Sequence, residues 1–236
     1  LLLVDKPAGI TSFDVVRAIR RRIGERRVGH AGSLDPIATG LLLLGYGWAT
    51  KRLGTMLKLE KSYEGIVRFG VRTDTADSAG KPVANGPVDH LTIESIREAM
   101  RRFLGEIAQV PPMYSALKHE GRPLYALARR GLDVPRAARQ VTILEFDAVE
   151  WTSPDLRVRV SCTSGTYVRP LAEDLAVALG TVAHVASLRR TRIGPYRIED
   201  ALAPESWRTM PAEDILARGT AWLGKPTDPG EGEVVA

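Results

Sequence analysis

An aspartate in a glycine-rich segment is the residue of this chain best placed to do chemistry. Residues 29–40 read Gly-His-Ala-Gly-Ser-Leu-Asp-Pro-Ile-Ala-Thr-Gly, so Asp35 stands directly before Pro36. Glycine permits backbone shapes that other residues resist, and proline keeps the preceding residue out of the helical region. We therefore expect Asp35 on a stiff loop, ahead of a buried apolar strand at residues 41–46. On spacing alone, a turn in which Asp35 caps its own backbone is the competing interpretation.

Other kinds of catalytic site find no support in the sequence. The four histidines are well separated and none lies near Cys162, so no zinc-ligand spacing exists. The chain also lacks a Walker lysine, a dinucleotide fingerprint after a strand and a G-x-S-x-G elbow. We therefore expect carboxylate chemistry without a metal or a cofactor. A phosphotransferase or hydrolase built on Asp35 is a lower-ranked alternative, because a haloacid-dehalogenase site would want a second aspartate two residues on, where the chain has Ile37.

Several strands and helices must position this loop. Apolar patterning predicts strands at residues 1–4, 41–46, 63–69, 156–162 and 182–193. Helical spacing predicts four helices, each ended by a glycine. The first is capped by Ser12 and stops at Gly24, and the second covers residues 93–103 before Gly105. The third has Pro123 at its first position and ends at Gly131, and the fourth covers residues 171–179 before Gly180. Residues 28–40 are expected to form a loop. The elements do not alternate regularly, which favours an α+β fold with a mixed or antiparallel sheet.

Charge and composition narrow the choice of partner and compartment. The formal net charge is +5 and the isoelectric point is about 9.5. Arginines cluster at residues 20–22, 26–27, 101–102, 129–130 and 189–190, a distribution that suits RNA, although any single cluster is more often a solvated helix face. No apolar run approaches the roughly 20 residues that span a bilayer, so no membrane contact is expected. A single cysteine fits a reducing cytoplasm.

Seven segments in a fixed order carry a more specific signal than any one of them. They are residues 5–12, 29–40, 61–63, 72–75, 111–118, 162–169 and 187–190. Together they resemble, in the same order, the motifs of the TruB family, the tRNA pseudouridine-55 synthases. Ser33 is a conservative departure, because the family more often has threonine or alanine there. The resemblance implies a pseudouridine synthase fold, with a central mixed or antiparallel sheet flanked by helices and a catalytic cleft.

The resemblance also implies a reaction that needs no cofactor. Enzymes of this family break the bond between a uridine base and its ribose, turn the base and rejoin it through carbon. The substrate, uridine 55, lies in the T-loop of tRNA. Asp35 becomes the catalytic carboxylate, which either attacks the sugar or removes its proton. Burial alone can raise the pKa of a carboxylate by up to about 3–5 units, and the resemblance gives Arg169 the role of the cation that keeps Asp35 ionised.

Four further residues are implied around the flipped base. Tyr63 resembles the ring that stacks on the displaced uracil and takes part in moving the proton at carbon 5. Tyr167 and Leu188 resemble other walls of the base pocket, and His30 resembles a residue that contacts the flipped nucleotide. Without the resemblance, core packing is the simpler interpretation for the two tyrosines and the leucine, and solvation is the simpler one for the histidine. Stacking is worth about 1–3 kcal/mol per base, which offsets the cost of unstacking.

The resemblance divides the chain as well. Residues 1–216 are expected to form the catalytic domain, with an RNA-clamping insertion at residues 105–139, and residues 217–236 to form a loose tail without a complete PUA domain. The RNA-binding residues implied are Lys6, Lys118, Arg122, Arg129 and Arg130. The insertion is either mobile until RNA binds or a stable helical hairpin.

The expected partner is the T-arm stem-loop of tRNA, bound by a monomer. One alternative function stays open from a different class. The chain is then a tRNA-binding folding factor, or RNA chaperone, in which catalysis is incidental. Replacing Asp35 with asparagine separates the two functions, because a pure binder would keep its full effect on tRNA folding.

Overall fold

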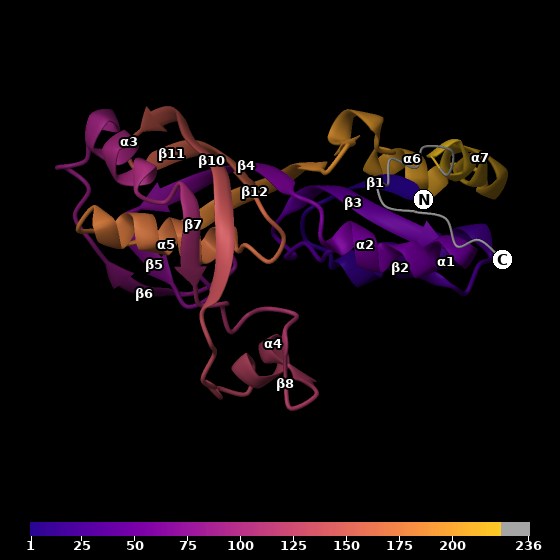
Figure 1. Cartoon of the computed structure of the whole chain (residues 1–236), viewed down its shortest axis with the longest axis horizontal. Helices are drawn as coiled ribbons and strands as arrows, with labels where there is room; N and C mark the ends of the chain where they lie inside the picture. Colours follow the sequence, from indigo (N-terminus) through magenta and orange to yellow (C-terminus); the bar gives the residue numbers. More distant parts are fainter. Residues whose placement is uncertain (223–236) are drawn as a thin grey trace, which may run out of the picture.

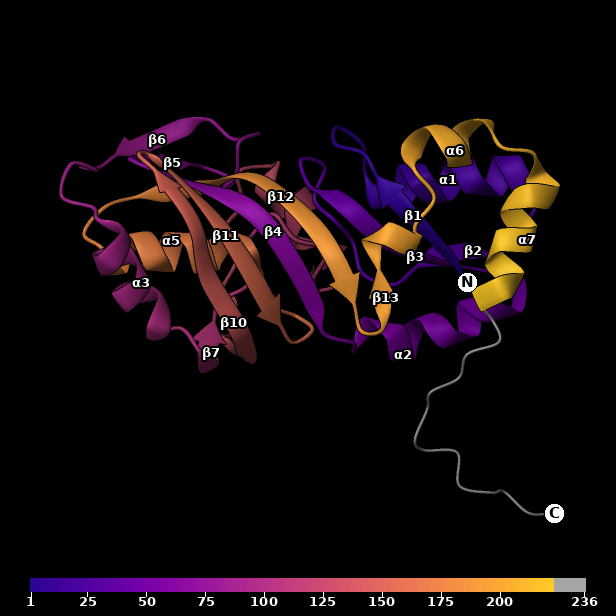
Figure 2. The ribbon, with the colours of Figure 1, turned by 90° about the horizontal axis from the view of Figure 1, so that it is seen from above.

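A nine-stranded mixed sheet runs through the molecule in the computed structural model, which describes residues 1–222 (Figures 1 and 2). Along the sheet lie β1 (Leu2–Lys6), β3 (Thr39–Tyr46), β12 (Ala183–Ile193), β4 (Lys61–Phe69), β11 (Asp155–Cys162), β10 (Arg139–Thr152) and β7 (Gly105–Gln109). Two short strands, β2 (Val28–His30) and β13 (Tyr196–Arg197), pair with β3 and β12. The predicted α+β fold with a mixed sheet is confirmed.

The sheet consists of two halves that meet at a short parallel contact. Strands β3 and β12 pair in parallel at Thr39 with Arg189 and at Gly40 with Arg190. The other strand pairs of this sheet are antiparallel. This contact comes four residues after Asp35 in the sequence, so the loop that carries Asp35 lies where the two halves join.

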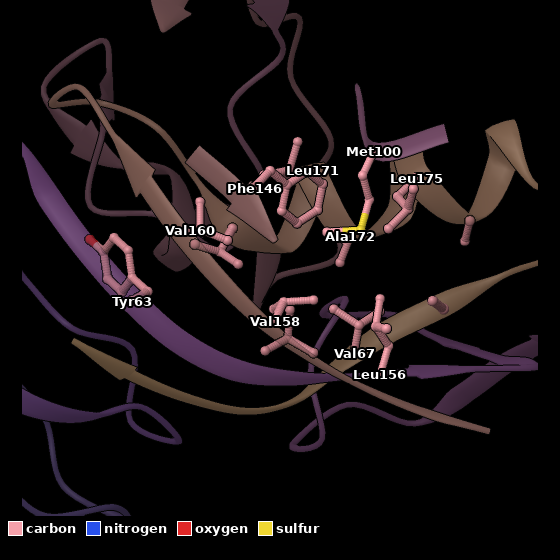
Figure 3. Close-up of a cluster of buried hydrophobic side chains, with 14 of the residues drawn as sticks. Tyr63, Val67, Met100, Phe146, Leu156, Val158, Val160, Leu171, Ala172 and Leu175 are labelled. Atoms are coloured by element: carbon pink, nitrogen blue, oxygen red, sulfur yellow. The ribbon is translucent and has the colours of Figure 1, made fainter. Parts of the chain in front are cut away.

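The larger half packs one face of the sheet against helices α3 (Ile93–Arg101) and α5 (Val168–Ala178) (Figure 2). Alternation along β11 explains this packing, because buried Leu156, Val158 and Val160 alternate with exposed Arg157 and Arg159. Figure 3 shows these apolar side chains in one cluster with those of α5. The helix predicted over residues 171–179 and the strand predicted over residues 156–162 are therefore confirmed.

The smaller half buries β3 on both faces. Leu42 and Leu44 pack in a core with α1 (Ser12–Ile23), α6 (Pro204–Thr209) and α7 (Ala212–Trp222). Leu41 and Leu43 belong to a separate cluster on the other face, which includes Ile193. Because each face of β3 meets apolar neighbours, the strand reads as an unbroken apolar run rather than an alternating one.

Smaller elements complete the chain. They are η1 (Gly47–Arg52), α2 (Leu53–Leu57), β5 (Val71–Thr73), β6 (Pro82–Asn85) and η2 (Ile198–Asp200). Residues 110–138 leave the sheet between β7 and β10 and form a lobe that projects from the body (Figure 1), with β8 (Lys118–His119), β9 (Arg122–Pro123) and α4 (Leu124–Ala128). The lobe is shorter than the predicted insertion, because residues 105–109 and Arg139 belong to the sheet.

Local details differ from the predictions at three helix and strand ends. Thr11, not Ser12, caps α1, because the Thr11 hydroxyl accepts the Asp14 N–H at 3.1 Å. Pro123 is the residue before α4 rather than its first position. Residues 28–30 form β2 instead of a loop, since they pair with the end of β3. The two helix starts differ from the predictions by one residue, and only β2 depends on a tertiary contact, its pairing with β3.

The end of the chain also differs from the prediction. Helix α7 runs past Leu216 to Trp222, and the Tyr46 hydroxyl lies 3.3 Å from the Leu216 carbonyl oxygen, to which it donates. The first residues of the expected tail therefore belong to a helix packed on the body. The remainder of that expected tail, residues 223–236, lies outside the described residues.

Candidate active site

The loop that carries Asp35 is held in place from the N-terminal segment. The Ser12 hydroxyl accepts a hydrogen bond from the Leu34 N–H at 2.9 Å. The Gly9 N–H donates to the Pro36 carbonyl oxygen at 2.8 Å. These bonds fix the residues on either side of Asp35, so Gly9 and the first residue of α1 together position the loop.

Lys6 supports the same loop and is not on the RNA-binding surface where we expected it. Its side chain is 0% exposed, and its ammonium donates to the carbonyl oxygens of Pro7, Ile10 and Pro36 at 2.9, 2.8 and 3.4 Å. Burial lowers the pKa of Lys6 to about 8, and the nearby Asp35 charge opposes this shift. Lys6 is therefore a buried support of the loop that carries Asp35.

Arg190 is a second buried cation that sequence reasoning did not single out as a site residue. Its guanidinium donates to the carbonyl oxygens of Gly32 at 3.0 Å and Leu41 at 2.8 Å, so it ties the loop to β3. Gly40 explains the close approach of β12, because a Cβ on Gly40 would lie 2.3 Å from the Arg190 carbonyl oxygen. In the sequence it stands in an arginine doublet at the end of segment 187–190, which resembles a family motif.

An ion pair joins Asp35 to the start of α5. The Arg169 Nε lies 2.9 Å from the Asp35 Oδ2. The Arg169 side chain is 4% exposed, whereas the Asp35 side chain is 37% exposed. The structure thus brings together two residues far apart in the sequence, with the cation buried and the carboxylate open to solvent on one side. This geometry leaves the carboxylate accessible to a ligand.

Arg169 also holds two other segments against the site. Its Nη1 donates to the Thr75 carbonyl oxygen at 2.9 Å, and its Nη2 donates to the Tyr114 carbonyl oxygen at 2.6 Å. The buried carboxylate of Asp77 lies 3.9 Å from the Arg169 Nη1. Asp77 was missed from the sequence, where it is one of several polar residues in a turn-like stretch. A single guanidinium therefore contacts the loop that carries Asp35, the turn after β5 and the lobe.

The surroundings of Asp35 push its pKa in opposite directions. Burial has the largest effect and raises the pKa of Asp35 above its ordinary value, and the Asp77 charge adds to the rise. Arg169, by its charge and its hydrogen bond, and Lys6, by its charge, lower that pKa. The net shift is upward, so the ionised form of Asp35 depends on the neighbouring cations.

Two expected walls of the base pocket pack next to the loop that carries Asp35. Tyr63 and Leu188, each 9% exposed, belong to the same buried cluster as Leu34 and Ala38 of the loop (Figure 3 shows Tyr63). Burial raises the pKa of the Tyr63 phenol, and the nearby Arg190 charge opposes that rise. This placement is compatible with base stacking and with core packing, so the stacking role stays a prediction.

Tyr167 and His30 approach the site from two other elements. Tyr167 directly precedes α5, and the charges that act on its phenol include those of Asp35 and Arg169. His30 ends β2, where its Nδ1 is buried and has no hydrogen-bond partner among the described residues. Burial lowers the pKa of His30, and Arg190 adds to this effect, so the neutral ring is favoured. Their contacts with a nucleotide stay predictions.

The predicted RNA-binding cations of the insertion are grouped on the lobe. They are the exposed residues Lys118, Arg122, Arg129 and Arg130. The Arg129 guanidinium stacks 5.6 Å from the ring centre of the exposed Tyr125. Within residues 1–222, no group of three or more candidate ligand side chains is placed to hold a metal ion. Over the same residues, no helix is long and apolar enough to cross a membrane.

Two family models match the chain. The model described as "TruB family pseudouridylate synthase (N terminal domain)" covers residues 20–168, which is more than half of the chain. The chain belongs to the TruB family. A second TruB model, "tRNA pseudouridylate synthase B C-terminal domain", covers residues 169–214. The border between the two models thus falls between Val168 and Arg169, directly at the start of α5.

Curated relatives of this TruB chain are similar over nearly its whole length. A protein of Aromatoleum aromaticum named tRNA pseudouridine synthase B is 49% identical over 95% of this chain and 73% of its own length. Its namesake from Bordetella pertussis is 42% identical over 89% of this chain and 87% of its own length. These identities support the family assignment independently of the family models.

Solved structures show the same fold. A chain from the archaeal box H/ACA sRNP Nop10–Cbf5 complex matches with a TM-score of 0.65 and 26% identity over 88% of this chain. A chain from a Cbf5–Nop10–Gar1 complex matches with a TM-score of 0.68 and 26% identity over 92% of this chain. The TruB chain spans 52% and 61% of those two chains. The predicted pseudouridine synthase fold is therefore confirmed.

Proposed function

We propose that this chain converts uridine 55 in the T-loop of tRNA to pseudouridine, with Asp35 as the catalytic carboxylate. The observation that carries the assignment of Asp35 is its 2.9 Å ion pair with Arg169, on a loop fixed by α1 and open to solvent. Family membership supports the reaction, and the relatives named tRNA pseudouridine synthase B support the substrate.

The reaction is an isomerisation, so no atom is gained or lost. The bond between N1 of the uracil and C1′ of the ribose breaks, and a bond forms between C5 of the uracil and C1′. The hydrogen on C5 is lost as a proton, and N1 gains a proton in exchange. Asp35 either attacks the sugar or removes a proton from it, and both routes require the ionised carboxylate. Tyr63, packed beside the loop, offers a face for stacking during the turn.

The charge and hydrogen bond of Arg169 favour the ionised form of Asp35. A buried carboxylate at neutral pH tends toward its protonated form, which could neither attack nor accept a proton. The positive charge of the Arg169 guanidinium opposes that tendency, because it lowers the pKa of Asp35. Its further bonds to the Thr75 and Tyr114 carbonyl oxygens hold it in place while the base moves.

Stacked arginines support RNA binding outside the site. The exposed aromatic side chains include Phe13 on α1, Trp48 on η1 and Tyr125 on α4. An arginine guanidinium lies 5.3–5.6 Å from each of these ring centres. Exposed aromatic faces next to fixed cations suit the bases and phosphates of RNA. We assign the RNA-clamping role to the lobe that carries Tyr125, and the protein acts as a monomer in the cytoplasm.

The test is incubation with unmodified tRNA, followed by mapping of pseudouridine at single-nucleotide resolution. We expect one new pseudouridine, at position 55, without any added metal or nucleotide. A tRNA with cytidine at position 55 is the matched control and should gain none. An isolated T-arm stem-loop should also be modified. Modification at other positions only, or no modification of a correctly folded tRNA, contradicts the proposed function.

A further inference from the structure

The side chain of Gln109 pairs with the backbone of Tyr167. Its Nε2 donates to the Tyr167 carbonyl oxygen at 3.0 Å, and its Oε1 accepts the Tyr167 N–H at 2.8 Å. Gln109 is 3% exposed. The side-chain amide therefore makes the two bonds that a neighbouring strand would make to an extended residue, and Tyr167 is extended, with φ −113° and ψ 121°.

This pairing holds the backbone directly before α5, the helix that carries the Arg169 partner of Asp35. Tyr167 is the residue before α5, and its own side chain does not cap that helix end. Arg169 follows two residues later and reaches Asp35 at 2.9 Å. A shift of the Tyr167 backbone would move both the tyrosine ring and the guanidinium. Misplacement of catalytic groups by about 1 Å can cost about a hundredfold in rate.

Gln109 also stands at the base of the lobe. It is the last residue of β7, opposite Arg139 of β10, so the chain leaves the sheet directly after it. The lobe returns to the site at Tyr114, whose carbonyl oxygen accepts from Arg169. Residues 109–114 therefore contact Tyr167 through Gln109 and Arg169 through Tyr114.

We propose that Gln109 is a positioning residue, whose amide holds Tyr167 and the start of α5 so that Arg169 meets Asp35. The inference rests on the proposed function for its effect on rate. The amide is required because one group must donate and the other accept. A leucine offers neither, and a carboxylate cannot donate to the Tyr167 carbonyl oxygen.

The chain offers a matched control for variants of Gln109. It contains one other glutamine, Gln140, which is exposed on β10 opposite Ala108. Gln109→Leu should lower the single-turnover rate of pseudouridine formation by about ten- to a hundredfold, with tRNA affinity within a few fold. Gln140→Leu should leave both quantities unchanged. Melting temperatures of both variants report whether the fold is retained.

Gln109→Glu tests the donor requirement through pH. Burial raises the pKa of a carboxyl group, and the protonated acid regains the ability to donate to the Tyr167 carbonyl oxygen. The charges that act at Tyr167 are those of Arg139, Asp35 and Arg169, and all three are also present in the wild type. The ratio of variant to wild-type rate should therefore rise as pH falls from about 8 to about 5. The same ratio for Gln140→Glu should stay flat.

A readout without catalysis separates this inference from the proposed function. Labelling tyrosine with ¹⁵N gives six backbone amide signals, one of them from Tyr167. We expect its hydrogen exchange to be slow in the wild type and at least about tenfold faster in Gln109→Leu. Unchanged exchange and unchanged rates in folded Gln109 variants would overturn the inference. An inactive wild type with a protected Tyr167 amide would instead contradict the proposed function and leave the backbone pairing intact.

Discussion

Burial and charge act in opposite directions on the Asp35 carboxylate. Burial raises its pKa, and the Arg169 guanidinium at 2.9 Å opposes the rise. The apolar packing and the cation thus have opposite effects on the pKa of Asp35. The packing removes water from one side of the carboxylate, and the cation keeps that carboxylate charged.

Replacing Arg169 should therefore change the pH dependence of the reaction. The active form of Asp35 is the ionised one, so activity is lost as pH falls through its pKa. Arg169→Gln removes a charge that lowers this pKa, so the acidic limb should move to higher pH by about one unit or more. The maximal rate should also fall. Single-turnover rates from about pH 5 to about pH 9 measure both effects.

The control for this change is Arg157→Gln. Arg157 is an exposed arginine on the sheet, where it lies 3.7 Å from Glu150. Its loss changes the net charge by the same amount but should leave the pH profile in place. An unshifted acidic limb in Arg169→Gln would show that Arg169 does not set the ionisation of Asp35.

Variants of Tyr63 distinguish its ring from its hydroxyl. Tyr63→Phe keeps the stacking face, so tRNA affinity should stay within about threefold of the wild type. Tyr63→Leu loses the face and should weaken binding, because stacking is worth about 1–3 kcal/mol per base. A slow Phe variant with normal affinity would assign the proton transfer to the hydroxyl. Wild-type rates and affinity in the Leu variant would remove Tyr63 from the site.

Single residues were predictable to different degrees. Asp35 and Arg169 stand in segments that resemble family motifs, and the structure places them in contact. Asp77 and Gln109 carry no local signal, because a buried polar side chain looks like a solvated one until its tertiary partners are known. Lys6 shows the opposite error, since the resemblance implied that it binds RNA, whereas its side chain is fully buried.

At the scale of elements, the loop that carries Asp35 is positioned by α1 and β1 together. Ser12 at the start of α1 bonds to Leu34, and Lys6 at the end of β1 bonds to Pro36. Helix and strand positions followed from apolar patterning, because β4, β11 and α5 each bury one regular face and β3 is an apolar run buried on both faces. The short strand β2 could not be predicted, since its pairing with β3 is set by the tertiary fold.

Lys6→Met tests whether the buried ammonium supports this loop. The pKa of Lys6 is about 8 in the folded protein and about 10.4 when unfolded. Between these pH values the unfolded state binds more protons, so this residue makes folding stability rise with pH. Methionine lacks the effect. The free energy of unfolding of the wild type, relative to Lys6→Met, should therefore increase from about pH 8 to about pH 10.

Urea denaturation at several pH values measures this difference. The exposed Lys58 provides the control, because Lys58→Met should show no such trend relative to the wild type. A constant difference between the wild type and Lys6→Met over the whole range would mean that the ammonium is not desolvated.

The lobe of residues 110–138 should contribute to RNA affinity through its charges. Arg129→Gln combined with Arg130→Gln should reduce the slope of log affinity against log salt, by about 0.7–0.9 for each phosphate that the protein no longer neutralises. The control is Arg157→Gln combined with Arg159→Gln on the exposed face of β11. Equal slopes for both double variants would place RNA binding away from the lobe.

At the scale of the whole molecule, the site lies where two halves of one sheet meet. The smaller half supplies the loop with Asp35, and the larger half supplies Arg169, Tyr63 and Leu188. The halves join through a parallel contact of two residue pairs directly after the loop. The α+β class was predictable from the irregular alternation of helices and strands. This junction was not predictable, because the apolar pattern within a strand does not determine which strands pair.

The measurement that tests the account most directly is pseudouridine formation at position 55 by Asp35→Asn. Asparagine keeps the size of the side chain but can neither attack the sugar nor remove its proton. We predict a single-turnover rate at least about a thousandfold below that of the wild type, with tRNA affinity within a few fold and an unchanged melting temperature. A folded Asp35→Asn variant that forms pseudouridine at a rate close to the wild type would contradict the central claim.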